Sequence, residues 1–108
     1  MADAPWDQLG TWVFDGDKAR TITPSKALQD RFPGQVTYVP GLRNSRDKRV
    51  RFDEVLSAAR GADVILAFLG EEAILSGEAH CLADLNLMGA QSELLAALKA
   101  TGKPVVAT

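Results

Sequence analysis

The chain has 108 residues, of which 46% are hydrophobic and 24% are charged, and its formal net charge is -2. This is the composition of an ordinary globular domain, and 108 residues suffice for one such domain. The weak negative charge argues against nucleic acid as a partner, and no apolar run approaches the roughly 18 residues that a membrane span needs.

The start of the chain indicates its cellular location, and its single cysteine limits the disulfides that it can form. The first ten residues contain neither the basic region nor the apolar region of a signal peptide. We therefore expect the chain as given to be cytoplasmic, whereas a longer parent protein with a leader would be periplasmic or secreted. The only cysteine, Cys81, excludes an intramolecular disulfide and is interpreted as a passive thiol.

The first half of the chain predicts one helix and one strand. Residues 1–20 are rich in aromatic residues without a clear period, which indicates an irregular loop with a short extended piece at residues 12–14. Thr23 followed by Pro24 is typical of a helix start, and Pro33 predicts the end of that helix. The alternating segment of residues 35–39 predicts a strand.

The second half predicts helix, strand, helix, strand. Phe52, Val55, Leu56 and Ala59 have helical spacing, and residues 64–69 are a continuous apolar run typical of a buried parallel strand. Residues 90–100 predict the last helix and residues 104–107 a further strand. This alternation predicts an α/β fold: a mostly parallel sheet with helices on both faces, in a flavodoxin-like layering.

The domain expected for residues 1–108 is a single but partial α/β sandwich. A doubly wound fold normally begins with a strand, whereas here no strand is predicted before the first helix. The last predicted strand also stops where the sequence stops. We therefore expect a portion of a larger domain, whose unpaired sheet edge would favour self-association.

A long loop at residues 70–88 follows the predicted strand 64–69. The carboxyl end of a parallel strand is where α/β proteins bind ligands, and a loop of this length is commonly functional. The titratable residues of the loop are Glu71, Glu72, Glu78, His80, Cys81 and Asp84. Gly77 allows a sharp turn that directs Glu78 outward, where a carboxyl group can act as a general acid/base. Solvated loop charges or helix N-terminal anions remain the alternative interpretation.

Metal, cofactor and anion sites are not expected. One histidine and one cysteine at this spacing match no zinc signature, and neither a dinucleotide fingerprint nor a phosphate-binding loop motif is present. The basic residues between positions 43 and 51 are interrupted by Asp47, so we interpret them as a solvated loop. We expect no cofactor and no metal.

Several ordered segments resemble one known family. They are Leu9-Gly10-Thr11-Trp12, Phe14-Asp15-Gly16-Asp17, Tyr38-Val39-Pro40-Gly41, Ala62-Asp63-Val64-Ile65-Leu66 with Gly70-Glu71, Ser76-Gly77-Glu78-Ala79, Asp84-Leu85-Asn86-Leu87 with Gln91, and Ala100-Thr101-Gly102-Lys103-Pro104-Val105-Val106. From about Ala4 to Val106 the chain resembles the carboxyl-proximal α/β sandwich domain of family-3 glycoside hydrolases, the bacterial β-glucosidase group.

The resemblance implies a retaining β-glucosidase in which a barrel domain supplies an aspartate nucleophile. The loop glutamate of the sandwich domain is then the general acid/base, which corresponds to Glu78. Glu71 and His80 are weaker candidates that would shape the substrate pocket. The substrate would be a β-linked glucoside, bound together with a barrel domain that is absent from this chain. Two positions depart from the family pattern, which has arginine in place of Leu82 and proline in place of Met88.

By the same resemblance the chain is part of an enzyme, an O-glycosyl hydrolase, that is incomplete on its own. Two other interpretations stay open at this point. One is a non-catalytic α/β module that binds a carbohydrate or a partner, with Trp6, Trp12 and Phe14 stacking on sugar rings. The other is a fragment without a function of its own.

Overall fold

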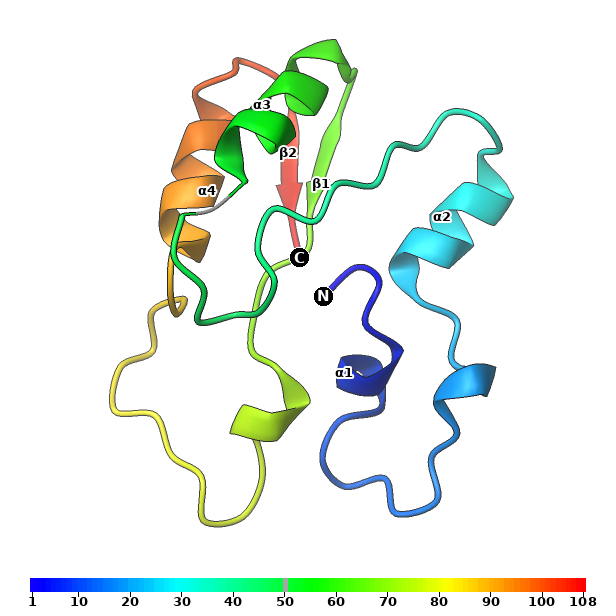
Figure 1. Cartoon of the computed structure of the whole chain (residues 1–108), viewed down its shortest axis with the longest axis vertical. Coiled ribbons are helices and arrows are strands. Elements are labelled where there is room, and N and C mark those ends of the chain that lie inside the picture. The colour runs from blue at the N-terminus through cyan, green and yellow to red at the C-terminus, as the bar shows by residue number, and fades with distance from the viewer. Residues whose placement is uncertain (50) are drawn as a thin grey trace. The chain divides into compact units, whose positions relative to one another are not determined.

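The computed structural model describes residues 1–49 and 51–108, which divide into two compact units (Figure 1). Unit 1 comprises Met1–Tyr38 and Glu71–Leu85, and unit 2 comprises Val39–Gly70 and Asn86–Thr108. Each unit is therefore built from two separate stretches, and the chain passes between them after Tyr38, Gly70 and Leu85. The single domain expected for residues 1–108 stays a prediction, because two compact units can belong to one domain.

Unit 2 has the predicted α/β order. Its elements are α3 (Phe52–Gly61), β1 (Ile65–Ala67), α4 (Gln91–Lys99) and β2 (Val105–Ala107). The two strands pair in parallel, with Ile65 opposite Val105 and Ala67 opposite Ala107. The α/β class and the parallel pairing are thereby confirmed.

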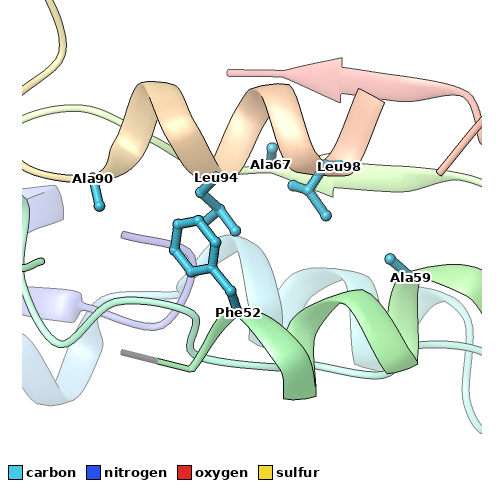
Figure 2. Close-up of a cluster of buried hydrophobic side chains, with 6 residues drawn as sticks. All are labelled: Phe52, Ala59, Ala67, Ala90, Leu94 and Leu98. Carbon is cyan, nitrogen blue, oxygen red and sulfur yellow. The ribbon is translucent and has the colours of Figure 1, made fainter. Parts of the chain in front are cut away.

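The hydrophobic core of unit 2 joins its two helices to β1 (Figure 2). It consists of Phe52, Ala59, Ala67, Ala90, Leu94 and Leu98. Phe52 and Ala59 come from the apolar face of α3 that their spacing predicted, and Leu94 and Leu98 lie one helical turn apart on α4. Burying a leucine or phenylalanine side chain contributes about 1.5–3 kcal/mol, so Phe52, Leu94 and Leu98 are the largest contributors among the buried residues.

The sheet of unit 2 has one packed face and one exposed face. Ala67 is buried, and Ile65 and Val105 pack against the core. Side chains alternate along a strand, so Leu66 and Val106 point to the opposite face, and both are exposed. Within the described residues the sheet contains only β1 and β2, which leaves each strand with one unpaired edge.

Unit 1 contains the short helix α1 (Pro5–Leu9), the 3-10 turns η1 (Lys18–Arg20) and η2 (Ala73–Leu75), and the helix α2 (Pro24–Arg31). The prediction for α2 is confirmed: the Thr23 side chain accepts a hydrogen bond from the Lys26 amide at 3.2 Å, and Pro24 occupies the first turn. The prediction of irregular structure for residues 1–20 is wrong at α1, where Pro5 begins the helix. Residues 12–14 form no strand.

The strand predicted at residues 35–39 is also wrong, because this segment is irregular. Its alternating β-formers lie between Gly34 and Pro40, and no described residue pairs with them. The strand propensity of a residue reflects how well its side chain packs on the surface of a sheet. Such a segment therefore forms no strand when no partner strand lies beside it. The boundary between the two units falls within this segment, after Tyr38.

No helix in the described part of the chain is long and apolar enough to cross a membrane.

Candidate functional site

The loop at residues 70–88 leaves unit 2 at Gly70 and runs through unit 1. Between β1 and α4 the described chain contains one regular element, the 3-10 turn η2. Gly70 has a φ of 140°, a conformation that residues with a side chain rarely adopt, and it turns the chain out of β1. Glu71, the first residue of the loop in unit 1, is exposed.

Two polar side chains of the N-terminal segment hold η2 within unit 1. Asp7, on α1, accepts a hydrogen bond from the Ala73 amide at 2.9 Å. The Thr11 hydroxyl lies 2.8 Å from the carbonyl oxygen of Ala73 and 2.9 Å from that of Ser76. A threonine hydroxyl carries one proton, so the two carbonyl groups share this donor. The start of the loop is thereby fixed two residues before Glu78.

Glu78 lies at the second position of a tight turn. The His80 amide donates to the Gly77 carbonyl oxygen at 3.2 Å, which closes the turn. Ala79, and not Glu78, has a positive φ of 64°, the pattern of a type II turn. Gly77 has a φ of 118°, and a Cβ atom there would lie 2.7 Å from Cγ2 of Thr11. The turn expected from Gly77 is therefore present, and glycine is required there for both conformation and space.

The His80 side chain also stabilises this turn, by a contact with the residue that precedes it. Its Nδ1 atom lies 3.1 Å from the carbonyl oxygen of Ser76, which cannot donate a proton. The contact therefore assigns the proton to Nδ1 and leaves Nε2 at the exposed edge of the ring. Ser76 thus receives contacts from both Thr11 and His80, and the chain between Ser76 and His80 presents Glu78 at its tip.

The Glu78 carboxylate itself is exposed and makes no hydrogen bond or ion pair with residues 1–49 or 51–108. Glu71 and Glu78 are separated by η2, and no hydrogen bond joins Glu71 to Glu78 or His80 in the described structure. The structure thus brings Glu78 and His80 into one turn and leaves Glu71 outside it. A free, solvent-facing carboxyl group can exchange a proton with a bound molecule but cannot select one alone.

The other end of the loop is held in unit 2 by Gln91, the first residue of α4. Gln91 is buried, with 2% of its surface exposed. Its Oε1 atom accepts from the Gly70 amide at 2.7 Å, and its Nε2 atom lies near the carbonyl oxygens of Ser45, Gly70 and Met88. Sequence reasoning missed this role, because Gln91 entered only as part of a family likeness. A polar residue at the start of an apolar helix was the available signal.

The loop exit also packs closely against the backbone of residues 45–47. The Ala90 amide donates to the Asp47 carbonyl oxygen at 2.8 Å. A Cβ atom on Gly89 would lie 2.5 Å from that same oxygen, and Gly89 has a φ of 59°. Met88, where the family pattern has proline, therefore does not leave the exit without support. Leu82, where the family has arginine, is exposed in the loop.

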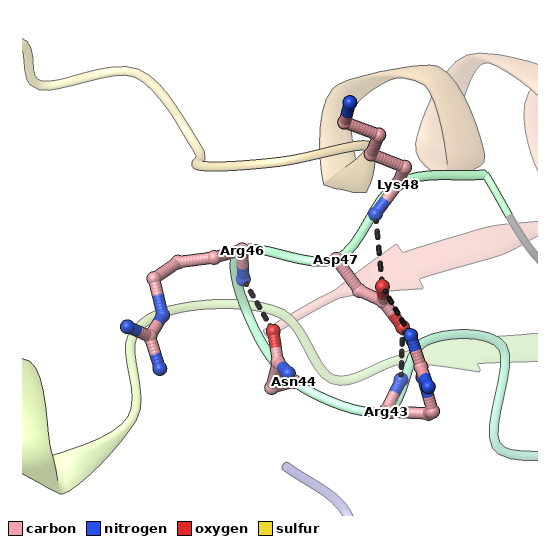
Figure 3. Close-up of polar contacts among 5 residues, drawn as sticks. All are labelled: Arg43, Asn44, Arg46, Asp47 and Lys48. Carbon is pink, nitrogen blue, oxygen red and sulfur yellow. Dashed lines mark hydrogen bonds and ion pairs between the residues drawn. The ribbon is translucent and has the colours of Figure 1, made fainter.

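The basic segment that provides this support is more ordered than a solvated loop (Figure 3). The Asp47 carboxylate accepts from the Arg43 amide at 3.2 Å, the Arg43 Nε at 2.9 Å and the Lys48 amide at 3.1 Å. The side-chain hydrogen bond from Arg43 lowers the pKa of Asp47 to about 2. Asn44 Oδ1 accepts from the Arg46 amide at 3.1 Å and closes a local turn.

No metal centre is formed by these groups. Among the described residues, no three side chains of histidine, cysteine, aspartate or glutamate are placed to hold a metal ion.

Comparison with known proteins identifies the family. The model of the glycosyl hydrolase family 3 C-terminal domain matches residues 2–108, so the chain belongs to this family. The chain is 27% identical to the periplasmic beta-glucosidase of Salmonella typhimurium, over 98% of this chain and 17% of that protein. It is 35% identical to a beta-xylosidase of Formosa agariphila, over 67% of this chain and 10% of that protein.

A solved structure supports the same assignment. A beta-glucosidase involved in saponin metabolism from intestinal bacteria superimposes with a TM-score of 0.73 at 27% sequence identity. The match covers 98% of this chain and 19% of that protein. The chain therefore spans less than a fifth of the relatives that it resembles over nearly its whole length. The resemblance to family-3 glycoside hydrolases drawn from the sequence segments is confirmed.

Proposed function

We propose that this chain supplies the general acid/base, Glu78, of a retaining β-glycosidase that cleaves β-linked glucosides. The nucleophile comes from a barrel domain that lies outside the chain. The proposal is supported by family membership and by the named activities of the relatives. The observation that carries it is the turn from Gly77 to His80, which presents Glu78 at its tip while Thr11 and His80 hold its base.

In this mechanism the Glu78 carboxyl first protonates the leaving glycosidic oxygen. The separate nucleophile attacks the anomeric carbon and forms a glycosyl-enzyme intermediate. The Glu78 carboxylate then takes a proton from the water that hydrolyses this intermediate. Retention requires the two carboxyl groups to lie about 5–5.5 Å apart in the assembled site. The exposure of Glu78 in this chain agrees with a group that gains its reaction partner from another domain.

The test uses a chimera in which this chain replaces the matching segment of the Salmonella relative. The chimera that carries Glu78→Gln is compared with the chimera that carries the unaltered chain. Loss of the acid should lower kcat/KM for aryl β-glucosides with poor leaving groups by about 10²–10⁴-fold. Glucosides with a dinitrophenyl leaving group need little protonation and should lose much less. Glu93→Gln, at an exposed position of α4, is the matched control and should change kcat/KM only slightly. An active chimera that is unaffected by Glu78→Gln would exclude the proposal, and the isolated chain should hydrolyse little or nothing.

A second candidate function, a carbohydrate-binding module, is favoured by the exposed aromatic residues of unit 1. Phe14 is 89% exposed, and Trp6 and Trp12 are exposed by more than half. Aromatic faces of this kind stack on sugar rings, although they also mark contact surfaces for other domains. Calorimetric titration with glucose and cellobiose distinguishes the two functions. Heat that disappears in Trp12→Ala would favour the binding module, and the absence of heat would exclude it.

The exposed face and open edges of the sheet support a proposal about assembly. We propose that the chain self-associates through the edge of β1 or β2, because exposed apolar strands with unpaired edges are templates for another strand. Light scattering should then show a mass that rises with concentration. Leu66→Lys should suppress the rise, whereas Ser57→Lys on the exposed surface of α3 should not. A monomer at every concentration contradicts the proposal.

We further propose a periplasmic parent protein, which rests on the name of the Salmonella relative. Fractionation of the native host with an antibody against this chain tests it, and a purely cytoplasmic signal would contradict it.

A further inference from the structure

We propose that Gln91 is a positioning residue that holds the two ends of the loop at residues 70–88 together. Gln91 contacts Gly70, where the loop leaves unit 2, and Met88, where it returns. It also contacts Ser45, which belongs to the segment that packs against the loop exit. A single side chain therefore joins both loop ends to the start of α4.

The hydrogen-bonding capacity of the amide is fully used. Oε1 accepts from the Gly70 amide at 2.7 Å, and Nε2 lies 3.0 Å from the Ser45 and Gly70 carbonyl oxygens and 3.2 Å from that of Met88. Two protons on Nε2 face three carbonyl oxygens, so at least one proton is shared. No buried side-chain nitrogen or oxygen in the described residues lacks a partner, Gln91 included. The site requires one acceptor and one double donor on the same side chain.

This requirement excludes the close relatives of glutamine. Asparagine is one methylene shorter and cannot reach the same partners from the same backbone position. Glutamate has the right length, but its ionised form would place a buried carboxylate against three carbonyl oxygens and donate nothing. Methionine fills a similar volume without forming these bonds. The contact geometry thus separates a role for the amide from a role in packing.

The consequence for Glu78 rests on the proposed function. Glu78 lies on the loop whose ends Gln91 fixes, so Gln91 acts on the reaction only through the loop and touches no substrate. We call the hydrogen bonds of Gln91 to Gly70 and Met88 the Gln91 clamp. Because this clamp fixes both ends of the loop, it limits the positions at which the loop can present Glu78 to a nucleophile on another domain. The clamp itself is a property of unit 2 and can be measured without any activity.

The experiment measures hydrogen exchange at the Gly70 amide in the 108-residue chain by NMR. Gln91→Met should lower the protection of the Gly70 amide about tenfold, while the amide of Leu98 in α4 keeps its protection. Gln91→Glu provides the sharper readout. Burial against carbonyl oxygens raises the pKa of a carboxyl group, and its protonated form keeps the acceptor for the Gly70 amide and offers one donor, one fewer than the amide.

The sign follows from that raised pKa. In Gln91→Glu the clamp should be present below the unfolded-state pKa of about 4.3 and should be lost as pH rises through the folded-state pKa. Gly70 protection should therefore be near wild type at pH 4.5 and about tenfold lower at pH 7.5. The neighbouring Asp47 carboxylate stays ionised over this range, because its pKa is about 2. Gln29→Glu, on the exposed surface of α2, is the matched control and should show no such pH dependence.

Two results would overturn the proposal. One is wild-type Gly70 protection in Gln91→Met, which would assign the residue to packing alone. The other is a pH-independent Gly70 protection in Gln91→Glu, and this variant decides the matter even where Gln91→Met does not fold. Neither result bears on Glu78, whose role is tested separately by leaving-group dependence in the chimera.

Discussion

The two units of this chain are stabilised in different ways. Unit 2 has a contiguous apolar core made by two helices and a strand, whereas the only buried apolar residue of unit 1 in the described structure is Ala73. Unit 1 is held instead by polar side chains that bond to backbone groups, as Asp7 and Thr11 do. We therefore expect unit 2 to act as the scaffold, and the candidate acid/base belongs to the unit with less buried apolar surface. Functional loops are commonly drawn from regions of low local stability.

The largest effect should come from the core of unit 2. Leu98 is 3% exposed, so Leu98→Ala should lower the free energy of unfolding by about 2–5 kcal/mol through lost burial and the cavity that remains. Leu85 in the loop is 97% exposed, and Leu85→Ala should change it by less than about 0.5 kcal/mol. Urea unfolding followed by circular dichroism measures both. Equal losses would contradict the contrast between scaffold and loop.

A smaller and more local effect is expected from Thr11. Thr11→Val keeps the shape of the side chain and removes the donor to Ala73 and Ser76, which should cost about 1 kcal/mol. The loss should appear as faster proteolysis between residues 71 and 85, with little change in the unfolding of unit 2. Thr37→Val at an exposed position is the control. A large loss of global stability in Thr11→Val would show that the units are not stabilised separately.

The turn that presents Glu78 should respond in the opposite direction. An L-residue at positive φ costs roughly 1–2 kcal/mol, and glycine removes this cost while adding about 0.5–1 kcal/mol of chain entropy. Ala79→Gly should therefore make the turn slightly more populated. Ala83 lies in the same loop and has no positive φ, so Ala83→Gly should only make the loop more flexible and the turn less populated. Exchange of the His80 amide, which closes the turn, reports both changes.

The smallest effect at neutral pH should come from the charged segment. The pKa of Asp47 is lowered to about 2 from an ordinary value of 3.8, mainly by the side-chain hydrogen bond from Arg43. A lowered folded-state pKa contributes stability above the unfolded-state value, and this contribution is lost as pH falls from about 4 to about 2. Asp47→Asn should remove that part of the acid dependence of unfolding. If the free energy of unfolding of Asp47→Asn depended on pH between these values as it does in the unaltered chain, the role given to Arg43 would be contradicted.

The difference between the apolar core of unit 2 and the polar contacts of unit 1 also explains which elements the sequence could predict. The elements of unit 2 follow from periodicity, since Phe52, Val55, Leu56 and Ala59 place one face of α3 in the core. The helix α1 was missed because its five residues are too few to show a period. The strand at residues 35–39 was wrongly predicted because its pattern needs a partner strand that the described residues do not provide.

The candidate site was predictable in outline only. Gly77 indicated a turn, and the family likeness selected Glu78. The contacts that hold η2 and this turn come from Asp7, Thr11 and His80, and the contacts at the loop ends come from Gln91. Apart from His80 and the contact of Gln91 with Met88, these side chains meet backbone atoms that lie far away in the sequence. A local pattern can mark Gln91 as an unusual residue, but it does not name the partners of these contacts, which only the folded chain shows.

The contacts of Thr11 and Asp7 have a consequence for the order of folding. They join residues that are 62, 65 and 66 positions apart in the chain, whereas the helices of unit 2 form from neighbours. Contacts of long sequence separation are slow to form, because the intervening chain must be closed first. We therefore expect the segment that carries Glu78 to be the last part of the molecule to acquire its structure. A refolding chain would then form the helices α3 and α4 before the turn that presents Glu78.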